Sequence, residues 1–206
     1  MLSFKVFSFP VVVYPVFFLG AFLLGPGFGL GWQMLVWVAV VFVSILIHEL
    51  GHAVVGKLLG GEPEIHLQML GGVTYPRLRR RPGPLQQFVL SVAGPLAGIG
   101  LGAAAWALGR AMPPDPESPS AMAMEFIRFC SFVWAGFNLL PILPLDGGQM
   151  MLAIIEGVRR KPSEILASWV SAAIALAAAL VVFAHYGIRE PFLLGWFVLF
   201  AFQNFS

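Results

Sequence analysis

The sequence is apolar and poor in charge. Of its 206 residues, 59% are hydrophobic and 11% are charged, whereas charged residues make up about a quarter of an ordinary soluble domain. This composition excludes a soluble globular protein and predicts a membrane protein built from apolar helices. The single cysteine, Cys130, excludes an internal disulfide and a cysteine-based metal site, so we interpret it as a packing residue.

Apolar runs predict about six membrane-spanning helices. In chain order, these runs cover residues 6–24, 34–59, 85–108, 121–140, 165–184 and 192–205. The first run is interrupted by Pro10 and Pro15 and has the alternative of a signal peptide, but no small-residue cleavage site follows it, so we expect a retained helix. The predicted fold is an all-α polytopic membrane protein, with residues 1–206 as a single domain.

The second run holds polar residues that are unusual inside a membrane span. It reads "VSILIHELGHAVVGKLLG" and contains His48, Glu49 and His52. A charged side chain at the middle of a bilayer costs about 2.5–3.5 kcal/mol on insertion scales, so these residues need a compensating partner. Positions i and i+4 share one helix face about 6 Å apart, so the two imidazoles can bind a single metal ion. Glu49 lies beside the pair, where it can act as a general base on a metal-activated water.

The polar connection after this span predicts a short β-hairpin that dips toward the membrane. Its sequence is "GGEPEIHLQMLGGVTYP", in which Ile65 and Leu67 alternate with His66 and Gln68. Glycines interrupt this alternation before it resumes, as in two strands joined by a turn. The predicted fold therefore includes one membrane-associated hairpin after the second helix.

A third metal ligand is required, because a catalytic zinc ion usually has three protein ligands and one open position. His66 and His185 qualify by type, but His66 follows the helix in a polar segment and His185 lies near the opposite membrane face. Asp146 in "PLDGGQ" is favoured, since Pro141 and Pro144 prevent a regular helix and irregular backbone at membrane depth must face protein or water. An additional role of Asp146 as a helix N-cap is compatible with metal binding.

The basic residues orient the predicted spans. The connections after the second and fourth spans carry clusters of Arg and Lys, whereas the connection after the third carries one arginine and two acids. Because positive segments remain in the cytoplasm, we expect both termini to be cytoplasmic. We interpret the "RLRRRP" cluster at 77–82 as a topological signal, with lipid contact as a second role, and expect no nucleic-acid partner.

Together these motifs resemble the site-2 protease family of intramembrane zinc metalloproteases. The chain has "HELGH" in a span, "LGG" in the next connection, "AGP" in the following span and "NLLPILPLDGG" further on, in that family's order. The resemblance covers a core at 34–152, with peripheral helices at 6–24, 165–184 and 192–205. By span count it indicates the minimal six-helix type, for which we expect no PDZ or CBS domain.

The resemblance implies regulated intramembrane proteolysis, in which a peptide bond within or near a transmembrane helix of a substrate protein is hydrolysed. One Zn²⁺ per chain would be held by His48, His52 and Asp146, with Glu49 as the base. Asn138 matches the family's polar residue that binds substrate or stabilises the oxyanion, and an interhelical hydrogen bond is its alternative role.

The resemblance also assigns a place for the substrate. The "LGG" position matches the family's strand region, so Leu70, Gly71, Gly72 and Val73 are predicted to bind an extended substrate as an added strand. The alternative is a cytoplasmic loop that only packs on the helices.

The expected partners are a transmembrane protein or peptide substrate and the lipid bilayer, with a regulatory membrane protein as a further possible partner and the oligomeric state left open. The expected location is a prokaryotic cell membrane, as a multi-pass protein. Alternative functions are a non-proteolytic membrane zinc-binding or transport protein and a catalytically silent chaperone of the same fold. The remaining spans hold no chain of acids or histidines for transport, so proteolysis is favoured.

Overall fold

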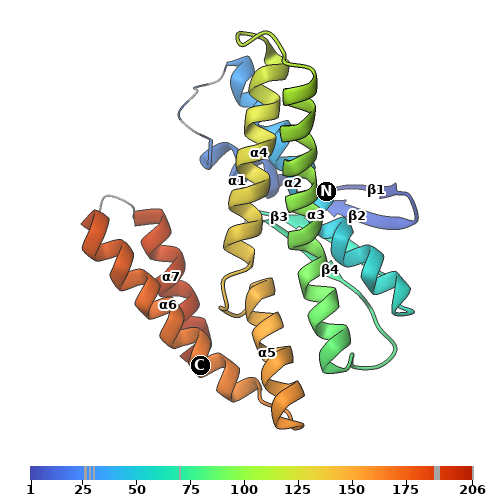
Figure 1. Cartoon of the computed structure of the whole chain (residues 1–206), viewed down its shortest axis with the longest axis vertical. Coiled ribbons are helices and arrows are strands. Elements are labelled where there is room, and N and C mark those ends of the chain that lie inside the picture. The colour runs from blue at the N-terminus through green and yellow to red at the C-terminus, as the bar shows by residue number, and fades with distance from the viewer. Residues whose placement is uncertain (26, 28, 30, 70, 188–190, 206) are drawn as a thin grey trace. The chain divides into compact units, whose positions relative to one another are not determined.

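The computed structural model describes residues 1–206 except 26, 28, 30, 70, 188–190 and 206, and leaves the side chains of 192 and 205 undescribed. The described chain is mainly helical, as predicted (Figure 1). Its elements are β1 (Leu2–Val6), β2 (Phe9–Val13), α1 (Pro15–Leu23), α2 (Trp32–Leu58), β3 (Glu64–Gln68), β4 (Gly71–Tyr75), α3 (Pro84–Ala111), α4 (Pro119–Asn138), α5 (Asp146–Arg159), α6 (Glu164–Tyr186) and α7 (Pro191–Phe205).

The chain divides into two compact units. The first comprises Met1–Arg81 and Ala93–Phe137, and the second comprises Pro82–Val92 and Asn138–Ser206. Helix α3 contributes to both units, because its first residues belong to the second unit and the rest to the first. A single metalloprotease domain over residues 1–206 stays a prediction.

The first unit contains a four-stranded sheet in the order β1-β2-β3-β4. Strands β3 and β4 form the predicted antiparallel hairpin, with Glu64 opposite Tyr75 and Gln68 opposite Gly71. The sequence analysis missed the other two strands, which form an antiparallel hairpin of their own and join the sheet through parallel pairing of β2 with β3. The sheet is therefore larger than predicted.

The prediction of a continuous helix at residues 6–24 is wrong. This segment contains strand β2 and the helix α1, which has nine residues. The run of β-branched valines at 11–13 fits a pleated sheet, and Pro15 occupies the first turn of α1, where its missing N–H costs nothing. Pairing of β2 with β3 supplies the backbone hydrogen bonds that a helix would have made internally.

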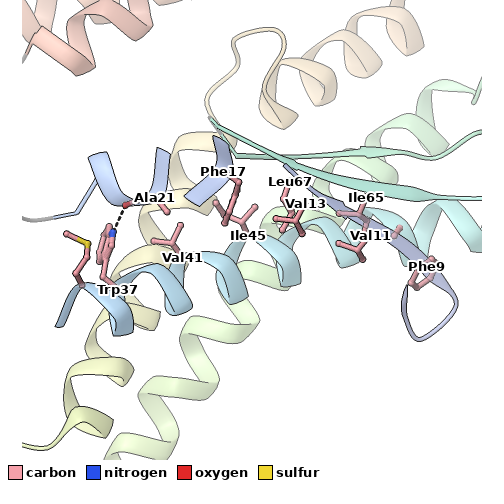
Figure 2. Close-up of a cluster of buried hydrophobic side chains, with 12 residues drawn as sticks. Phe9, Val11, Val13, Phe17, Ala21, Trp37, Val41, Ile45, Ile65 and Leu67 are labelled. Atoms are coloured by element: carbon pink, nitrogen blue, oxygen red, sulfur yellow. Dashed lines mark hydrogen bonds between the residues drawn. The ribbon is translucent and has the colours of Figure 1, made fainter. Parts of the chain in front are cut away.

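The segment 9–23 packs alongside α2 and forms the main core of the first unit with it (Figure 2). Trp37 Nε1 of α2 donates a hydrogen bond to the Ala21 carbonyl at 2.9 Å, and the rings of Phe17 and Phe42 meet edge to face at 6.0 Å. At the other end of the cluster, side chains of β2 and β3 pack on α2. The buried members are Phe9, Val11, Val13, Phe17, Ala21, Met34, Trp37, Val41, Ile45, Ala53, Ile65 and Leu67.

The second unit contains α5, α6, α7 and the start of α3. Helices α6 and α7 pack on each other along their lengths. Ser171 of α6 and Asn204 of α7 both bind the irregular segment before α5: the Leu143 N–H donates to Ser171 Oγ at 3.0 Å, and Asn204 Nδ2 donates to the Leu143 carbonyl at 2.7 Å.

Within the described residues, three helices are long and apolar enough to cross a membrane, namely α2, α3 and α6. A shorter apolar helix covers Leu193–Asn204 within α7. Helix α4 occupies the predicted fourth span, but Glu125 and Arg128 lie in it and it is not among these candidates. A count of about six spans is therefore not confirmed.

Candidate metal centre

His48 and His52 lie one turn apart on α2, and both are buried, with 2% and 8% of their surface exposed. Their Nε2 atoms are 3.3 Å apart, and their rings meet at 78°. Two nitrogens that bind one tetrahedral zinc ion at about 2.0–2.1 Å are separated by about 3.3–3.4 Å. The two imidazoles are therefore spaced as a zinc ion requires.

Glycines let α3 approach this part of α2 closely. A Cβ atom at Gly94 of α3 would overlap the imidazole of His52, and one at Gly51 of α2 would overlap the Ala93 carbonyl. By contrast, a Cβ atom at Gly98 would fit, because it would lie 3.9 Å from Nδ1 of His48, an ordinary van der Waals distance. The glycine of the "AGP" motif thus provides the space in which the His52 ring lies.

Glu49 is also buried, with 4% of its surface exposed, and β4 covers its carboxylate. Thr74 Oγ1 lies 2.7 Å from Glu49 Oε2 and 3.0 Å from the Glu49 carbonyl oxygen, so the threonine hydroxyl donates to this residue. Gly72 packs directly on the carboxylate, because a Cβ atom there would overlap Cγ, Cδ and Oε1. The sequence analysis did not identify Thr74. The only indication of its role is that it carries a hydroxyl on the sheet face that otherwise holds apolar residues such as Ile65.

The predicted substrate-binding residues lie on β4, except Leu70, which falls outside the described residues. Gly71 has a φ of 137° and packs on the indole of Trp134 in α4. Gly72 packs on Glu49, and Val73 is 42% exposed. Gly71 therefore lies against α4, and Gly72, like Thr74, lies against α2.

Asp146 belongs to the second unit, where it is the first residue of α5 and half-buried. The capping position is Leu145, so the alternative in which Asp146 caps the helix is wrong. Gly147 and Gly148 pack on the backbone of Leu139 to Leu143, where Cβ atoms would overlap it. The irregular backbone before Asp146 therefore packs closely on the first turn of α5.

Asn138 is the last residue of α4 and is half-buried. Gln149, one turn into α5, lies 3.4 Å from the Gln87 side chain, whose Nε2 donates to its Oε1. The proposed role of Asn138 in substrate binding stays a prediction.

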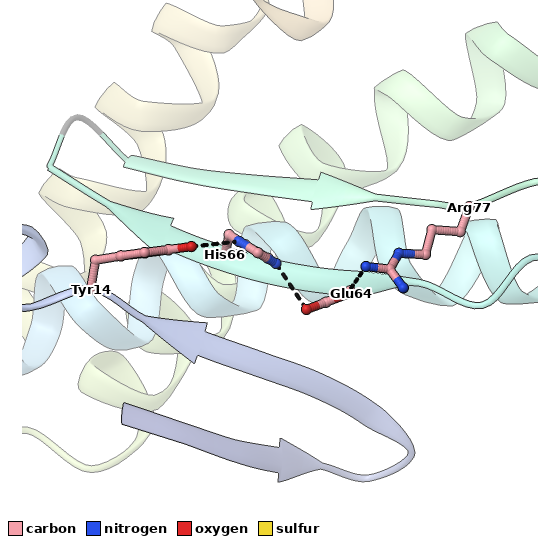
Figure 3. A network of polar contacts seen from close by, with 4 residues as sticks. All are labelled: Tyr14, Glu64, His66 and Arg77. Atoms are coloured by element: carbon pink, nitrogen blue, oxygen red, sulfur yellow. Dashed lines mark hydrogen bonds and ion pairs between the residues drawn. The ribbon is translucent and has the colours of Figure 1, made fainter. Parts of the chain in front are cut away.

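The other two histidines, His66 and His185, have contacts of their own. His66 lies on the sheet face opposite the buried Ile65 and Leu67, with Nδ1 3.4 Å from the Tyr14 hydroxyl and Nε2 3.0 Å from a carboxylate oxygen of Glu64 (Figure 3). Arg77 forms an ion pair with the same carboxylate group. His185 is exposed on α6, with its ring against the next residue.

Comparison with known proteins gives a consistent result. Residues 115–182 match the model of Peptidase family M50. The chain is 28% identical to the Synechocystis sp. protein sll0528, over 80% of this chain and 45% of that protein. It is 31% identical to zinc metalloprotease MJ0392 of Methanocaldococcus jannaschii, over 56% of this chain and 33% of that protein. The chain thus spans less than half of the length of these curated relatives.

The fold matches a solved structure, the site-2 protease from Methanocaldococcus jannaschii. The TM-score is 0.64 at 22% sequence identity, and the match covers 98% of this chain and 94% of that one. With its apolar helices, the chain is an integral membrane protein. These findings confirm the resemblance drawn from the motifs: residues 115–182 are similar to Peptidase family M50, the relatives are named zinc metalloproteases, and the fold is like that of the solved site-2 protease.

Proposed function

We propose that this chain is an intramembrane zinc metalloprotease, which hydrolyses a peptide bond within or near a transmembrane helix of a membrane-protein substrate. One observation carries the proposal: two histidine Nε2 atoms lie 3.3 Å apart beside a buried glutamate, in a helix that is long and apolar enough to cross a membrane. Such a combination is costly in a bilayer unless it serves a site. The relative MJ0392 is named a zinc metalloprotease and the solved neighbour a site-2 protease, which supports the same function.

One Zn²⁺ per chain would be held by His48 and His52 of α2, with Asp146 of α5 as the third ligand that the resemblance to the family implies. Two imidazoles and one carboxylate leave a fourth position open, as catalytic zinc sites do. When bound, zinc lowers the pKa of a water molecule and polarises the substrate carbonyl.

The residues of the chain supply the proton transfers. Glu49 is the general base: its carboxylate accepts a proton from the attacking water and delivers it to the leaving amine. Its burial in the first unit excludes bulk water, which strengthens the electrostatic interactions of the carboxylate. Asn138 would bind the substrate or stabilise the oxyanion.

The free edge of β4 would hold the substrate. Strand β4 is the last strand of the sheet, and its described residues have β3 as their strand partner on one side. An added strand is selected by its backbone, so the edge at Gly71, Gly72 and Val73 would favour a substrate that is locally extended. A helical peptide bond cannot present its carbonyl, which is why the protease needs such an edge.

We also propose a cellular location and a membrane orientation for the protein. The substrate is a transmembrane protein or peptide in a lipid bilayer, and the chain is a multi-pass protein of a prokaryotic cell membrane with both termini cytoplasmic. The basic clusters at 77–81 and 159–161 support this orientation. A regulatory membrane protein is a further possible partner.

Zinc content of purified variants tests the ligand set. The wild-type protein should bind one zinc per chain, and His48→Ala, His52→Ala and Asp146→Ala should each lose zinc, because each removes one of three ligands. His66→Ala is the matched control and should keep zinc, since His66 is bound to Glu64 on the other face of the sheet. Full zinc in Asp146→Ala would remove that residue from the ligand set. A zinc-loaded wild type that cuts no single-span peptide would favour the non-proteolytic zinc-binding or transport protein.

A further inference from the structure

We propose that Thr74 is a positioning residue for Glu49, so that the strand proposed to hold the substrate also orients the general base. The inference rests on the proposed function for its catalytic consequence. The hydrogen bond between Thr74 and Glu49 does not depend on that function, so the hydrogen bond and the function can be tested separately.

The register of the sheet places Thr74 on its buried face. Val11 of β2 pairs with Ile65 of β3, and Ile65 pairs with Thr74 of β4, so the three side chains lie in one row across the sheet. Val11 and Ile65 are fully buried. The first two members of this row are apolar, and at the third, on β4, a hydroxyl stands in a position that would suit valine, which has the same shape as threonine. A hydroxyl on such a face costs free energy unless it has a hydrogen-bond partner.

Glu49 is that partner. The Thr74 hydroxyl has one hydrogen to donate, and its distance to Oε2, 2.7 Å, is shorter than its distance to the Glu49 carbonyl, 3.0 Å. A hydrogen bond to a carboxylate is also the stronger of the two, because the acceptor is charged. The hydroxyl therefore fixes Oε2, and Gly72 packs against the remainder of the carboxylate, including Oε1.

This arrangement restricts the general base. A glutamate side chain has several rotatable bonds, and a base that samples several rotamers is in the reactive one for part of the time. Thr74 and Gly72 hold the Glu49 carboxylate from one strand, because Oε2 accepts the threonine hydrogen bond and Gly72 packs against Cδ and Oε1. In active sites, a base is commonly oriented by a third group in this way.

A double-mutant cycle on metal-free protein in detergent tests the contact without any activity. Thr74→Val should lower the melting temperature in the wild-type background, because it removes the hydrogen bond but keeps the shape. In a Glu49→Ala background the same substitution should have a smaller effect or none, since the partner is already gone. Ser3→Ala removes an exposed hydroxyl from the opposite edge strand, β1, and should give equal effects in both backgrounds. Additive effects of Thr74→Val would overturn the inference.

Cleavage kinetics test the positioning role. The substrate is the single-span peptide, chosen from a panel, that the wild type cleaves fastest. We expect Thr74→Val to lower kcat about 10- to 100-fold, as loss of an outer-shell partner commonly does, with zinc content and KM unchanged. Thr74→Ser should restore most of kcat, because serine supplies the same donor. A wild-type kcat in Thr74→Val, or equal losses in Thr74→Val and Thr74→Ser, would contradict the inference. If the wild type cuts no peptide, the proposed function fails. The double-mutant cycle on melting temperature still tests whether Thr74 and Glu49 interact.

Discussion

Small residues beside functional side chains explain much of this site at the scale of single residues. Gly94 leaves room for the His52 imidazole, and Gly72 leaves room for the Glu49 carboxylate. In both cases a neighbouring element must approach the helix that carries the functional groups so closely that no Cβ atom fits. The geometry of the site therefore depends on glycines that make no chemical contribution themselves.

Gly94→Ala should weaken zinc binding, because the added methyl group displaces the His52 ring from its position beside His48. We expect at least a tenfold loss of zinc affinity, the size commonly seen when the support of a ligand is disturbed. Metal titration of the purified protein measures this. Gly100→Ala is the matched control on the same helix, because nothing lies within 4 Å of its Cβ position. It should keep zinc and gain about 0.5–1 kcal/mol of stability from alanine in a helix. Equal zinc affinity in both variants would contradict the steric argument.

The local part of the site could be predicted from the sequence, and the long-range part could not. His48, Glu49 and His52 lie within five positions of one helix, so helical geometry alone brings them together. Thr74 is 25 residues from Glu49, and its contact depends on the register of β4 and on how that strand packs on α2. A shift of one residue would turn Thr74 to the other face of the sheet.

At the scale of elements, alternation of apolar and polar residues correctly predicted the β3–β4 hairpin. The same kind of signal was weaker in the first segment, where valines at 11–13 are all buried or nearly so and show no alternation. An apolar run of that kind fits a buried strand as well as a helix. Pro10 and Pro15 were the local sign against a continuous helix, and the pairing of β2 with β3 settled the outcome.

The free edge of β4 leads to a prediction about substrate contact. A photoreactive phenylalanine analogue at Val73, whose side chain is 42% exposed, should crosslink to a single-span peptide because the added strand lies beside it. The experiment uses a Glu49→Gln background, in which the peptide stays uncut, and mass spectrometry identifies the product. The same analogue at Ser3, on the opposite edge strand, is the control. Crosslinking from Ser3 but not from Val73 would show that the substrate is held elsewhere.

At the scale of the whole molecule, composition predicted a membrane protein, and the long apolar helices bear this out. Helices α2, α3 and α6 are the described candidates for crossing a bilayer. The basic residues then predict which ends face the cytoplasm, because lysine and arginine are retained on that side during insertion. The connection 112–118 between α3 and α4 is acidic, whereas the segment 159–161, at the end of α5 and just after it, is basic.

Single cysteines test this orientation in a Cys130→Ala background. Glu117→Cys and Pro162→Cys place thiols at exposed positions of the two connections. A membrane-impermeant maleimide added to intact cells should label the first, and labelling of the second should require opened membranes. Labelling of both cysteines from the same side would contradict the topology.

The central claim is that Glu49 acts as a base beside a zinc ion that it does not hold. Its most direct test is the rate at which zinc-loaded Glu49→Gln cleaves a single-span peptide that the wild type cuts. The account predicts one zinc per chain in both proteins and a loss of about 10²- to 10⁴-fold in kcat, the usual contribution of a general base. Cleavage by Glu49→Gln at the wild-type rate would contradict it.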